Sequence, residues 1–307
     1  MTDSHAMGVN SGPILEPTAD GSDWAHVKAV VGEAGTSFFW AMRFLPKPQR
    51  RAMYAVYSFC REVDDIADGN MARADKHAAL DLWRGDIAAL FEDRDPAYPT
   101  ARVLADIVPH YGLNRSDFEA MIDGMAMDAD GPIQAPSTAT LDLYCDRVAS
   151  AVGRMSVPIF GERSSEGQDV ATHLGRALQL TNILRDIRED AEDARVYLPR
   201  EVLERNGITD FTPLAVADHP NLPSVAREVG AMAAQAFDRA DAALAKCDST
   251  AMKPAIMMRA VYRRLLDRMA ADRFAQAGQP RPRGPVAKAG RSVGKLWIAV
   301  RYGLLPQ

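Results

Sequence analysis

Apolar residues recur every three or four positions from about Asp23 onward, and no segment alternates strictly between apolar and polar residues. This spacing is typical of amphipathic α-helices, whose buried face repeats with the helical turn. Prolines and glycines interrupt the pattern, as at Pro46, Pro48 and Gly131, and mark helix ends. The pattern predicts an all-α fold with helices over roughly residues 24–45, 49–70, 75–93, 100–111, 115–128, 139–160, 168–193, 199–206, 224–247, 250–278 and 290–302.

The helical pattern continues without an internal repeat or a linker, so we expect one helical domain over residues 23–278. Residues 1–22 are rich in Gly, Ser, Pro and Asp and are predicted to be disordered, and residues 279–307 form a basic tail. Ser116 and Glu119 have the spacing of a capping box, which predicts a helix start at Ser116. The fourteen methionines either pack helices together or form a pliable apolar wall.

Composition excludes several classes of protein. The 307 residues are 47% hydrophobic and 25% charged with a net charge of −5, which argues against a nucleic-acid partner. Cys60, Cys145 and Cys247 have no paired spacing, as expected for reduced thiols in the cytoplasm. No Glu-x-x-His occurs, which disfavours zinc and di-iron sites. The sequence shows neither a secretion signal nor the ~20 apolar residues that a membrane span needs.

Two short acidic motifs carry the candidate chemistry. The first acidic motif is DDIAD at residues 64–68, and the second is NILRDIRED at residues 182–190. In each motif carboxylates recur four residues apart, so they project from one face of a helix and repel one another. Either motif alone is more often a solvated surface with ion pairs. Together, on helices that also carry apolar residues, they predict two faces that hold a diphosphate between Mg²⁺ ions across a cavity.

Arginines accompany both motifs, and they fit the same chemistry. Arg61 and Arg185 carry guanidinium groups, which bind phosphate oxygens in bidentate fashion and stay charged when partly buried. Acids for the metal and arginines for the anion would neutralise a departing diphosphate and so lower the barrier to a carbocation. An apolar wall would then keep that carbocation from water.

Seven stretches of the chain resemble the squalene/phytoene synthase family, and they occur in the family's order from about residue 30 to residue 275. They are SFF (37–39), FLP (44–46), RRA (50–52), YSFCREVDDIAD (57–68), YCDRVASAVG (144–153), QLTNILRDIRED (179–190) and RVYLP (195–199). The resemblance implies an isoprenoid-synthase-type helical bundle around a central cavity. It also implies head-to-head condensation of two prenyl diphosphates with two or three Mg²⁺ ions.

The resemblance assigns roles to individual residues. It implies metal ligands at Asp64, Asp68, Asn182, Asp186 and Asp190. It places Arg61, Arg185 and Gln179 on diphosphate oxygens, and Tyr57, Tyr262, Gly35, Thr36 and Ser37 around the substrate; Arg61, Arg185, Tyr57 and Tyr262 would take part in catalysis. Two positions depart from the family pattern. Ser150 replaces a frequent glycine where helices approach closely, and Thr36 replaces a lysine that in some relatives could contact phosphate.

Within the family, MIDGMAMD (121–128), GPI (131–133) and RVASAVGRMS (147–156) resemble the presqualene diphosphate synthases of the bacterial hopanoid pathway. That resemblance implies that two farnesyl diphosphates are joined, that NADPH is not used, and that a downstream isoprenoid enzyme takes the product. Phytoene synthase and squalene synthase remain alternatives in the same family. A terpene cyclase is an alternative of another class, although its second metal motif usually carries Ser and Glu after Asn-Asp. A helical lipid-binding protein with solvated acidic faces is the non-enzymatic alternative.

The tail after Asp272 contains no acidic residue. Its arginines and lysines alternate with Trp297 and other apolar residues, which is the pattern of a short amphipathic helix on anionic lipid. The same pattern also fits a C-terminal helix that packs Trp297 against the domain. The first alternative would place the protein in the cytoplasm at the inner face of the cell membrane.

Overall fold

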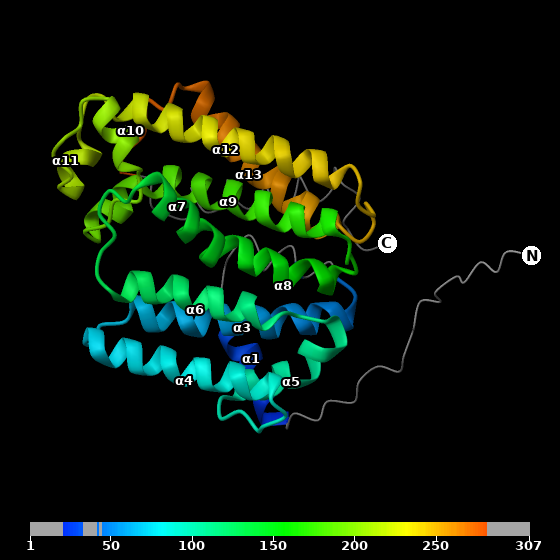
Figure 1. Ribbon diagram of the computed structural model, residues 1–307. Coiled ribbons are helices and arrows are strands. Elements are labelled where there is room, and N and C mark those ends of the chain that lie inside the picture. The colour runs from blue at the N-terminus through cyan, green and yellow to red at the C-terminus, as the bar shows by residue number, and fades with distance from the viewer. Residues whose placement is uncertain (1–20, 33–41, 43–44, 281–307) are drawn as a thin grey trace, which may run out of the picture.

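Helices form nearly all of the regular structure in residues 21–32, 42 and 45–280, which are the residues that the computed structural model describes (Figure 1). The prediction of an all-α fold is confirmed, since within these residues the only β-type pairing is an isolated bridge between Gln134 and Val196. The helices are α1 (Gly21–Gly32), α3 (Lys47–Asp68), α4 (Arg73–Phe91), α5 (Pro99–Tyr111), α6 (Arg115–Ala129), α7 (Thr138–Cys145), the π-helix η1 (Asp146–Ser150), α8 (Ala151–Phe160), α9 (Ser165–Glu192), α10 (Arg200–Arg205), α11 (Pro213–Ala217), α12 (Leu222–Leu244) and α13 (Lys253–Ala271).

The longest helix, α9, lies between two groups of helices (Figure 1). It packs against α12 and α13 on one side and against α7, η1 and α8 on the other. Helices α3 and α6 form the next layer and contact α8, while α4 and α5 lie beyond them. Helix α8 therefore contacts both α3 and α9, which carry the two acidic motifs.

Local sequence accounts for where α3 and α9 begin. Pro46 precedes α3, and Pro48 occupies its first turn, where no backbone N–H is required. The Ser164 hydroxyl caps α9 by accepting a hydrogen bond from the backbone N–H of Gly167 at 3.1 Å. Both helices then bury an apolar stripe, which includes Phe59 in α3 and Leu180 in α9. That burial fixes the rotation of each helix and hence the direction of its acidic motif.

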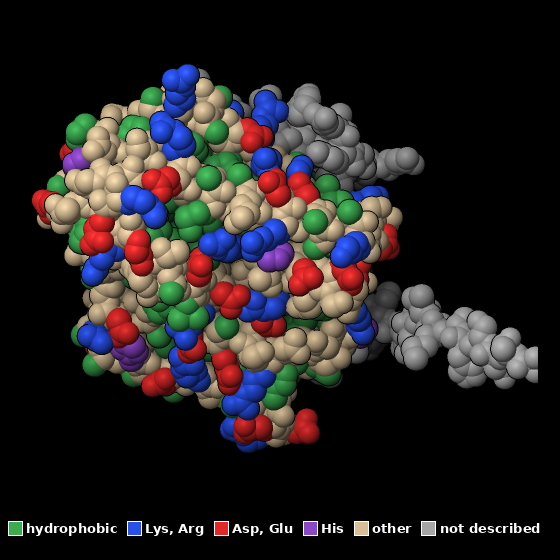
Figure 2. Space-filling view, turned by 45° about the horizontal axis from the view of Figure 1, so that its top comes forward, with side chains coloured by type: hydrophobic (Ala, Val, Ile, Leu, Met, Phe, Trp, Pro, Cys, Tyr) green, Lys and Arg blue, Asp and Glu red, His purple; other side chains and the backbone are tan. Residues whose placement is uncertain are grey.

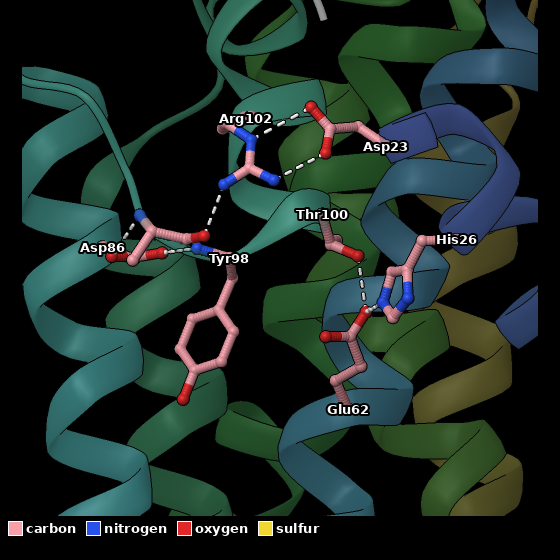
Figure 3. Close-up of polar contacts among 8 residues, drawn as sticks. Asp23, His26, Glu62, Asp86, Tyr98, Thr100 and Arg102 are labelled. Atoms are coloured by element: carbon pink, nitrogen blue, oxygen red, sulfur yellow. Dashed lines mark hydrogen bonds and ion pairs between the residues drawn. The ribbon is translucent and has the colours of Figure 1, made fainter. Parts of the chain in front are cut away.

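Polar contacts join α1, α3 and α5 behind the first acidic motif (Figure 3). The Glu62 carboxylate of α3 accepts a hydrogen bond from the Thr100 hydroxyl at 2.5 Å and lies 3.2 Å from the His26 ring. Arg102 of α5 donates to both oxygens of the buried Asp23 in α1, and this contact lowers the pKa of that carboxyl. The part-buried Glu62 contacts tie α3 to α1 and α5, and the Arg102–Asp23 pair ties α1 to α5.

A π-helical segment interrupts the helix that was predicted over residues 139–160. Helix α7 continues through η1 into α8, and the Ser150 hydroxyl at the end of η1 donates to the carbonyl of Thr172 at 2.9 Å. At Gly175 of α9 a Cβ atom would lie 2.6 Å from the backbone of Ser150. The close helix approach expected near Ser150 is therefore present, and the glycine that permits it lies on α9 instead.

Several predicted helix bounds were wrong. The helix predicted at 250–278 ends at Ala271, because Arg273 and Phe274 adopt left-handed backbone angles with φ of 56° and 57°. Helix α11 was not predicted at all. The predicted capping box does not form, since α6 begins at Arg115 and the Glu119 carboxylate instead pairs with the Arg115 side chain at 2.7 Å. Of the predicted helix at 24–45, only the part up to Gly32 and the isolated positions 42 and 45 are among the described residues.

The surface offers no single-sign patch in the view of Figure 2, where acidic and basic side chains are mixed over the face formed by α12 and its neighbours. In the described part of the chain, every helix is too short or too polar to cross a lipid bilayer. The predicted tail helix at 290–302 lies outside the described residues.

Candidate active site

The first acidic motif lies at the C-terminal end of α3, and part of its charge is neutralised on the same helix. The Arg61 guanidinium lies 3.2 Å from the Asp64 carboxylate and 2.7 Å from that of Asp65. Asp64 also lines a cavity in the interior of the bundle, together with Tyr57 and Cys60 from the preceding turns of α3. Asp64 is thus the member of the motif that reaches the interior.

The second acidic motif lies toward the C-terminal end of α9. Gln179 and Asn182 line the same cavity as Asp64. One turn later, Arg185 donates two hydrogen bonds to Asp186, at 2.8 and 2.5 Å, and lies against Tyr262 of α13. Burial would lower the pKa of Arg185, but the Asp186 carboxylate outweighs burial and raises it, so this guanidinium stays charged.

An ion pair connects the two ends of these helices. Arg195, in the loop that follows α9, places its Nη2 atom 2.7 Å from Oδ1 of Asp68 in α3. The loop is fixed by the backbone, because the N–H of Arg195 donates to the carbonyl of Asp190 and the N–H of Val196 donates to that of Ile133. The C-terminal ends of α3 and α9 therefore lie near one another with an arginine between them.

The cavity has a volume of about 430 Å³ and extends away from the acidic motifs between α3, α8, α9 and α13. Its polar end is formed by Asp64, Gln179, Asn182 and Tyr262. Most of the other lining side chains are apolar, among them Leu174, Leu178 and Met258. A site of this shape suits a ligand with an anionic head and a hydrocarbon chain.

Charge at the polar end is incompletely compensated. Burial raises the pKa of Asp64 to about 6, and repulsion from Asp68 adds to this rise. Burial also raises the pKa of Asp190 to about 7, with repulsion from Asp186 contributing. The side-chain oxygen of Asn182 is buried and has no hydrogen-bond partner among the described residues. A bound cation would supply what these three groups lack.

Magnesium fits this donor set. Among the described residues, no three Asp, Glu, His or Cys side chains lie close enough together to hold a metal ion. Mg²⁺ does not require such a cage, since it usually takes one or two carboxylates and completes its shell with water and substrate phosphates. The carboxylate and amide oxygens at the polar end are ligands of the type it prefers.

Comparison with known proteins places the chain in a family. A sequence profile described as squalene/phytoene synthase matches residues 31–288. The chain belongs to the squalene/phytoene synthase family. Members of this family are prenyltransferases, and the chain is accordingly an enzyme of that class. The alternative of a non-enzymatic lipid-binding protein is excluded by this membership.

Bacterial family members are similar over nearly the whole chain. A presqualene diphosphate synthase of Rhodopseudomonas palustris is 48% identical, and the match covers 88% of this chain and 94% of the relative. A presqualene diphosphate synthase of Zymomonas mobilis is 46% identical, with coverage of 89% and 91%. The crystal structure of a dehydrosqualene synthase in complex with a ligand matches with a TM-score of 0.75 at 26% identity, covering 92% of this chain and 96% of the other. The fold is the helical bundle of these isoprenoid synthases.

The structure places the predicted site residues in three groups. Tyr57, Asp64, Gln179, Asn182 and Tyr262 line the cavity. Arg61, Asp68, Arg185, Asp186 and Asp190 surround its polar end in the ion pairs and repulsive contacts described above. Gly35, Thr36 and Ser37 lie outside the described residues.

A buried cluster beside the first acidic motif was not predicted as part of the site. The Asp128 carboxylate at the end of α6 accepts hydrogen bonds from the hydroxyls of Tyr144 at 3.0 Å and Tyr197 at 2.9 Å. Burial raises the pKa of Asp128, although the two tyrosine hydrogen bonds lower it. Repulsion from Asp128 in turn contributes to the raised pKa of Asp64. All three residues lie in stretches that carry the family resemblance, and this position is the feature of the sequence that could have indicated a role in the site.

Proposed function

We propose that this protein joins two molecules of farnesyl diphosphate to form presqualene diphosphate, with release of one diphosphate. The observation that carries this proposal is the single cavity whose polar end holds Asp64 and Asn182, one from each acidic motif, while the remainder is apolar. The product is inferred from the presqualene diphosphate synthases that are 48% and 46% identical over most of the chain.

Mg²⁺ would be held by oxygens of Asp64 and Asp68 on α3 and of Asn182, Asp186 and Asp190 on α9, together with the diphosphate. When bound, Mg²⁺ supplies positive charge that stabilises the diphosphate as it leaves. Arg61 and Arg185 bind diphosphate oxygens, with Gln179 as an additional donor. The burial of Asn182 and the raised pKa values of Asp64 and Asp190 support these assignments.

The reaction breaks the C1–O bond of one substrate, whose electron pair leaves with the diphosphate. The 2,3-double bond of the second substrate attacks the resulting allylic cation at C1, and loss of a proton closes the cyclopropane ring. A diphosphate oxygen takes this proton, either directly or through the hydroxyl of Tyr57 or Tyr262, which would pass its own proton to the diphosphate as it accepts one. The apolar walls of the cavity keep water from the cation. The sequence of steps is redox-neutral and needs no nicotinamide.

The test is product analysis by mass spectrometry with the purified protein, Mg²⁺ and either farnesyl or geranylgeranyl diphosphate, with and without NADPH. We expect presqualene diphosphate from farnesyl diphosphate whether or not NADPH is present. Squalene formed only with NADPH, or a C40 product as the main product, would contradict the proposal. Asp64→Ala and Asp186→Ala should abolish turnover while the circular dichroism spectrum stays unchanged.

A peripheral membrane contact is part of the proposal, because the product is strongly apolar and the tail is basic. Removing residues 283–307 should weaken binding to vesicles that contain anionic lipid. Unchanged vesicle binding by the truncated protein would argue against a role of the tail.

A further inference from the structure

One end of the molecule is formed by the last turns of α13, the segment that follows it and the first turns of α12. The two helices are antiparallel, since Arg259 near the start of α13 pairs with Asp241 near the end of α12. Just after α13, Phe274 packs on Gly230, where a Cβ atom would lie 2.5 Å from the ring. Two surface pockets, of about 470 and about 290 Å³, meet at Phe274.

Three arginines border these two pockets. Arg227 and Arg273 line the larger pocket, and Arg268 lines the smaller one. All three side chains are exposed, and no carboxylate in the described part of the chain forms an ion pair with any of them. Arginines in such a position are available to an anionic ligand, because no ion pair has to be broken before they bind it.

Carboxylates near these arginines are already paired elsewhere. The pairs are Asp218 with Arg188, Glu228 with Arg205, and Asp267 with Arg263. Asp272 lines the smaller pocket and has no ion pair among the described residues, so it offsets part of the charge of Arg268. This end of the molecule therefore keeps an excess of positive charge at the pockets, although the whole chain has a net charge of −5.

Apolar side chains form much of the remaining lining of both pockets. Leu265, Met269 and Ala277 line the smaller pocket, and Ala270 and Phe274 line the larger one. Guanidinium groups bind phosphate oxygens, and apolar groups beside them can lie against the upper part of an acyl chain. The combination suits the phosphate headgroup of an anionic lipid better than it suits a fully hydrated small anion.

The basic tail begins at the smaller pocket. Gln279 and Pro280, the last described residues, line it, and the Arg188 side chain donates to the Gly278 carbonyl at 2.5 Å. The sequence from 281 to 307 contains arginines and lysines and no acidic residue. The tail therefore starts beside Arg268, and its charge has the same sign as that of the pockets.

We propose that Arg227, Arg268 and Arg273 form a lipid-docking surface of the folded domain, which binds the phosphate groups of anionic phospholipids. This inference deepens the peripheral membrane contact of the proposed function and rests on it. Arg185 also lines the smaller pocket, so the docked membrane would adjoin the polar end of the active site. The tail tethers the protein to the membrane, and the docking surface orients it there.

The test measures co-sedimentation of the full-length protein with vesicles of phosphatidylcholine, either alone or with about 30% phosphatidylglycerol. An arginine at an anionic surface strengthens binding about fivefold, so the triple variant Arg227→Gln/Arg268→Gln/Arg273→Gln should bind anionic vesicles about a hundredfold more weakly than wild type. Neutral vesicles should bind both proteins equally weakly. Turnover of farnesyl diphosphate in the absence of vesicles should be the same in both.

Arg73→Gln/Arg84→Gln/Arg94→Gln is the matched control, because it removes the same charge from α4 and the loop after it, in a layer remote from α12 and α13 (Figure 1). Salt screens exposed charges beyond about 8 Å, so the control should bind anionic vesicles within about twofold of wild type. An equal loss in both triple variants, or unchanged binding of the docking-surface variant, would overturn the inference. So would release of wild type from vesicles by inorganic diphosphate at an ionic strength where chloride has no effect, since the pockets would then be sites for a free anion.

Single variants decide the question if the docking-surface triple variant does not fold. Arg268→Gln and Arg273→Gln should each weaken binding to anionic vesicles about fivefold, and unchanged binding of both would overturn the inference. A wild-type protein that binds no anionic vesicles would refute the membrane contact and the docking surface together. A wild-type protein that binds vesicles but forms no product from farnesyl diphosphate would refute only the proposed reaction.

Discussion

Replacing Asp190 by asparagine should stabilise the metal-free protein and at the same time lower its activity. The carboxyl of Asp190 has an ordinary pKa of 3.8, which burial and the neighbouring Asp186 raise to about 7 in the folded state. At about 1.36 kcal/mol per pKa unit, the buried charge destabilises the folded state by at most about 4 kcal/mol. Asp190 is only partly buried, so solvent screening reduces this figure to about 2 kcal/mol.

The effect has a defined pH dependence. As pH rises above 3.8 the unfolded chain releases the Asp190 proton before the folded protein does, which favours unfolding, and the full penalty is reached above pH 7. At low pH the folded protein keeps Asp190 protonated, so Asp190→Asn removes no charge from the folded state there. The stability gain should therefore be about a third as large at pH 5 as at pH 8. Urea denaturation at both pH values measures it, and at pH 8 a gain of about 2 kcal/mol corresponds to roughly 4–8 °C in Tm.

Asp193→Asn is the control, because Asp193 is an exposed acid at the end of the same helix and its removal should change stability by no more than about 0.5 kcal/mol. Adding Mg²⁺ with inorganic diphosphate should raise the Tm of wild type more than that of Asp190→Asn. A loss of stability in Asp190→Asn at pH 8 would refute the reasoning, since it would mean that the carboxylate is held by favourable contacts and not at the expense of stability.

Three further predictions concern residues around the site. Gly175→Ala should lower the free energy of unfolding, measured by urea denaturation, by about 1–3 kcal/mol, because its Cβ would lie 2.6 Å from the backbone of η1. Gly85→Ala, on the open side of α4, should raise it by about 0.5–1 kcal/mol. Equal effects of the two variants would contradict the close packing of α9 on η1. Tyr197→Phe removes one of two hydroxyl donors to Asp128 and should cost about 1–2 kcal/mol by the same measurement, and an unchanged stability would show that water replaces the hydroxyl. Arg195→Gln should change the free energy of unfolding by less than about 1 kcal/mol, because the carboxylate of its partner Asp68 is 54% exposed. The same variant should reduce turnover in a steady-state assay. Full activity would show that Arg195 is not part of the active site.

The helices were predictable where their stripes are long and continuous. The predicted helix at 168–193 corresponds to α9 at Ser165–Glu192, and that at 49–70 to α3 at Lys47–Asp68. The end of α13 was not predictable, because its cause lies elsewhere in the chain. Phe274 turns back onto α12 at Gly230, where a Cβ atom would lie 2.5 Å from the Phe274 ring. No pattern within residues 250–278 records the shape of that partner surface.

The candidate site, like the fold, was predictable from the sequence only in part. That Asp64 and Asn182 share a cavity follows from two acidic motifs on helices with buried apolar stripes, which the sequence displays. The pairing of Asp68 with Arg195 does not follow from any local pattern, because the two residues are 127 positions apart and the geometry depends on how the loop after α9 is fixed. The hydrogen bonds that Asp128 accepts from the hydroxyls of Tyr144 and Tyr197 likewise depend on how α6 and α7 pack against the loop that contains Tyr197.

Three arginines, which pair with four aspartates, explain how so acidic a site is compatible with a folded protein. Arg61 holds Asp64 and Asp65, Arg185 holds Asp186, and Arg195 holds Asp68, so most carboxylates of the two motifs have a cation within 3.2 Å. Asp190 lacks such a direct pair among the described residues, and Asp64, though paired, is partly buried next to Asp68; these are the acids whose pKa values rise to about 7 and about 6. On the proposed function, cations that neutralise these acids would also weaken the hold of each carboxylate on its arginine. The guanidinium groups would then be free to bind diphosphate oxygens, so the same arginines can stabilise the resting protein and serve the reaction.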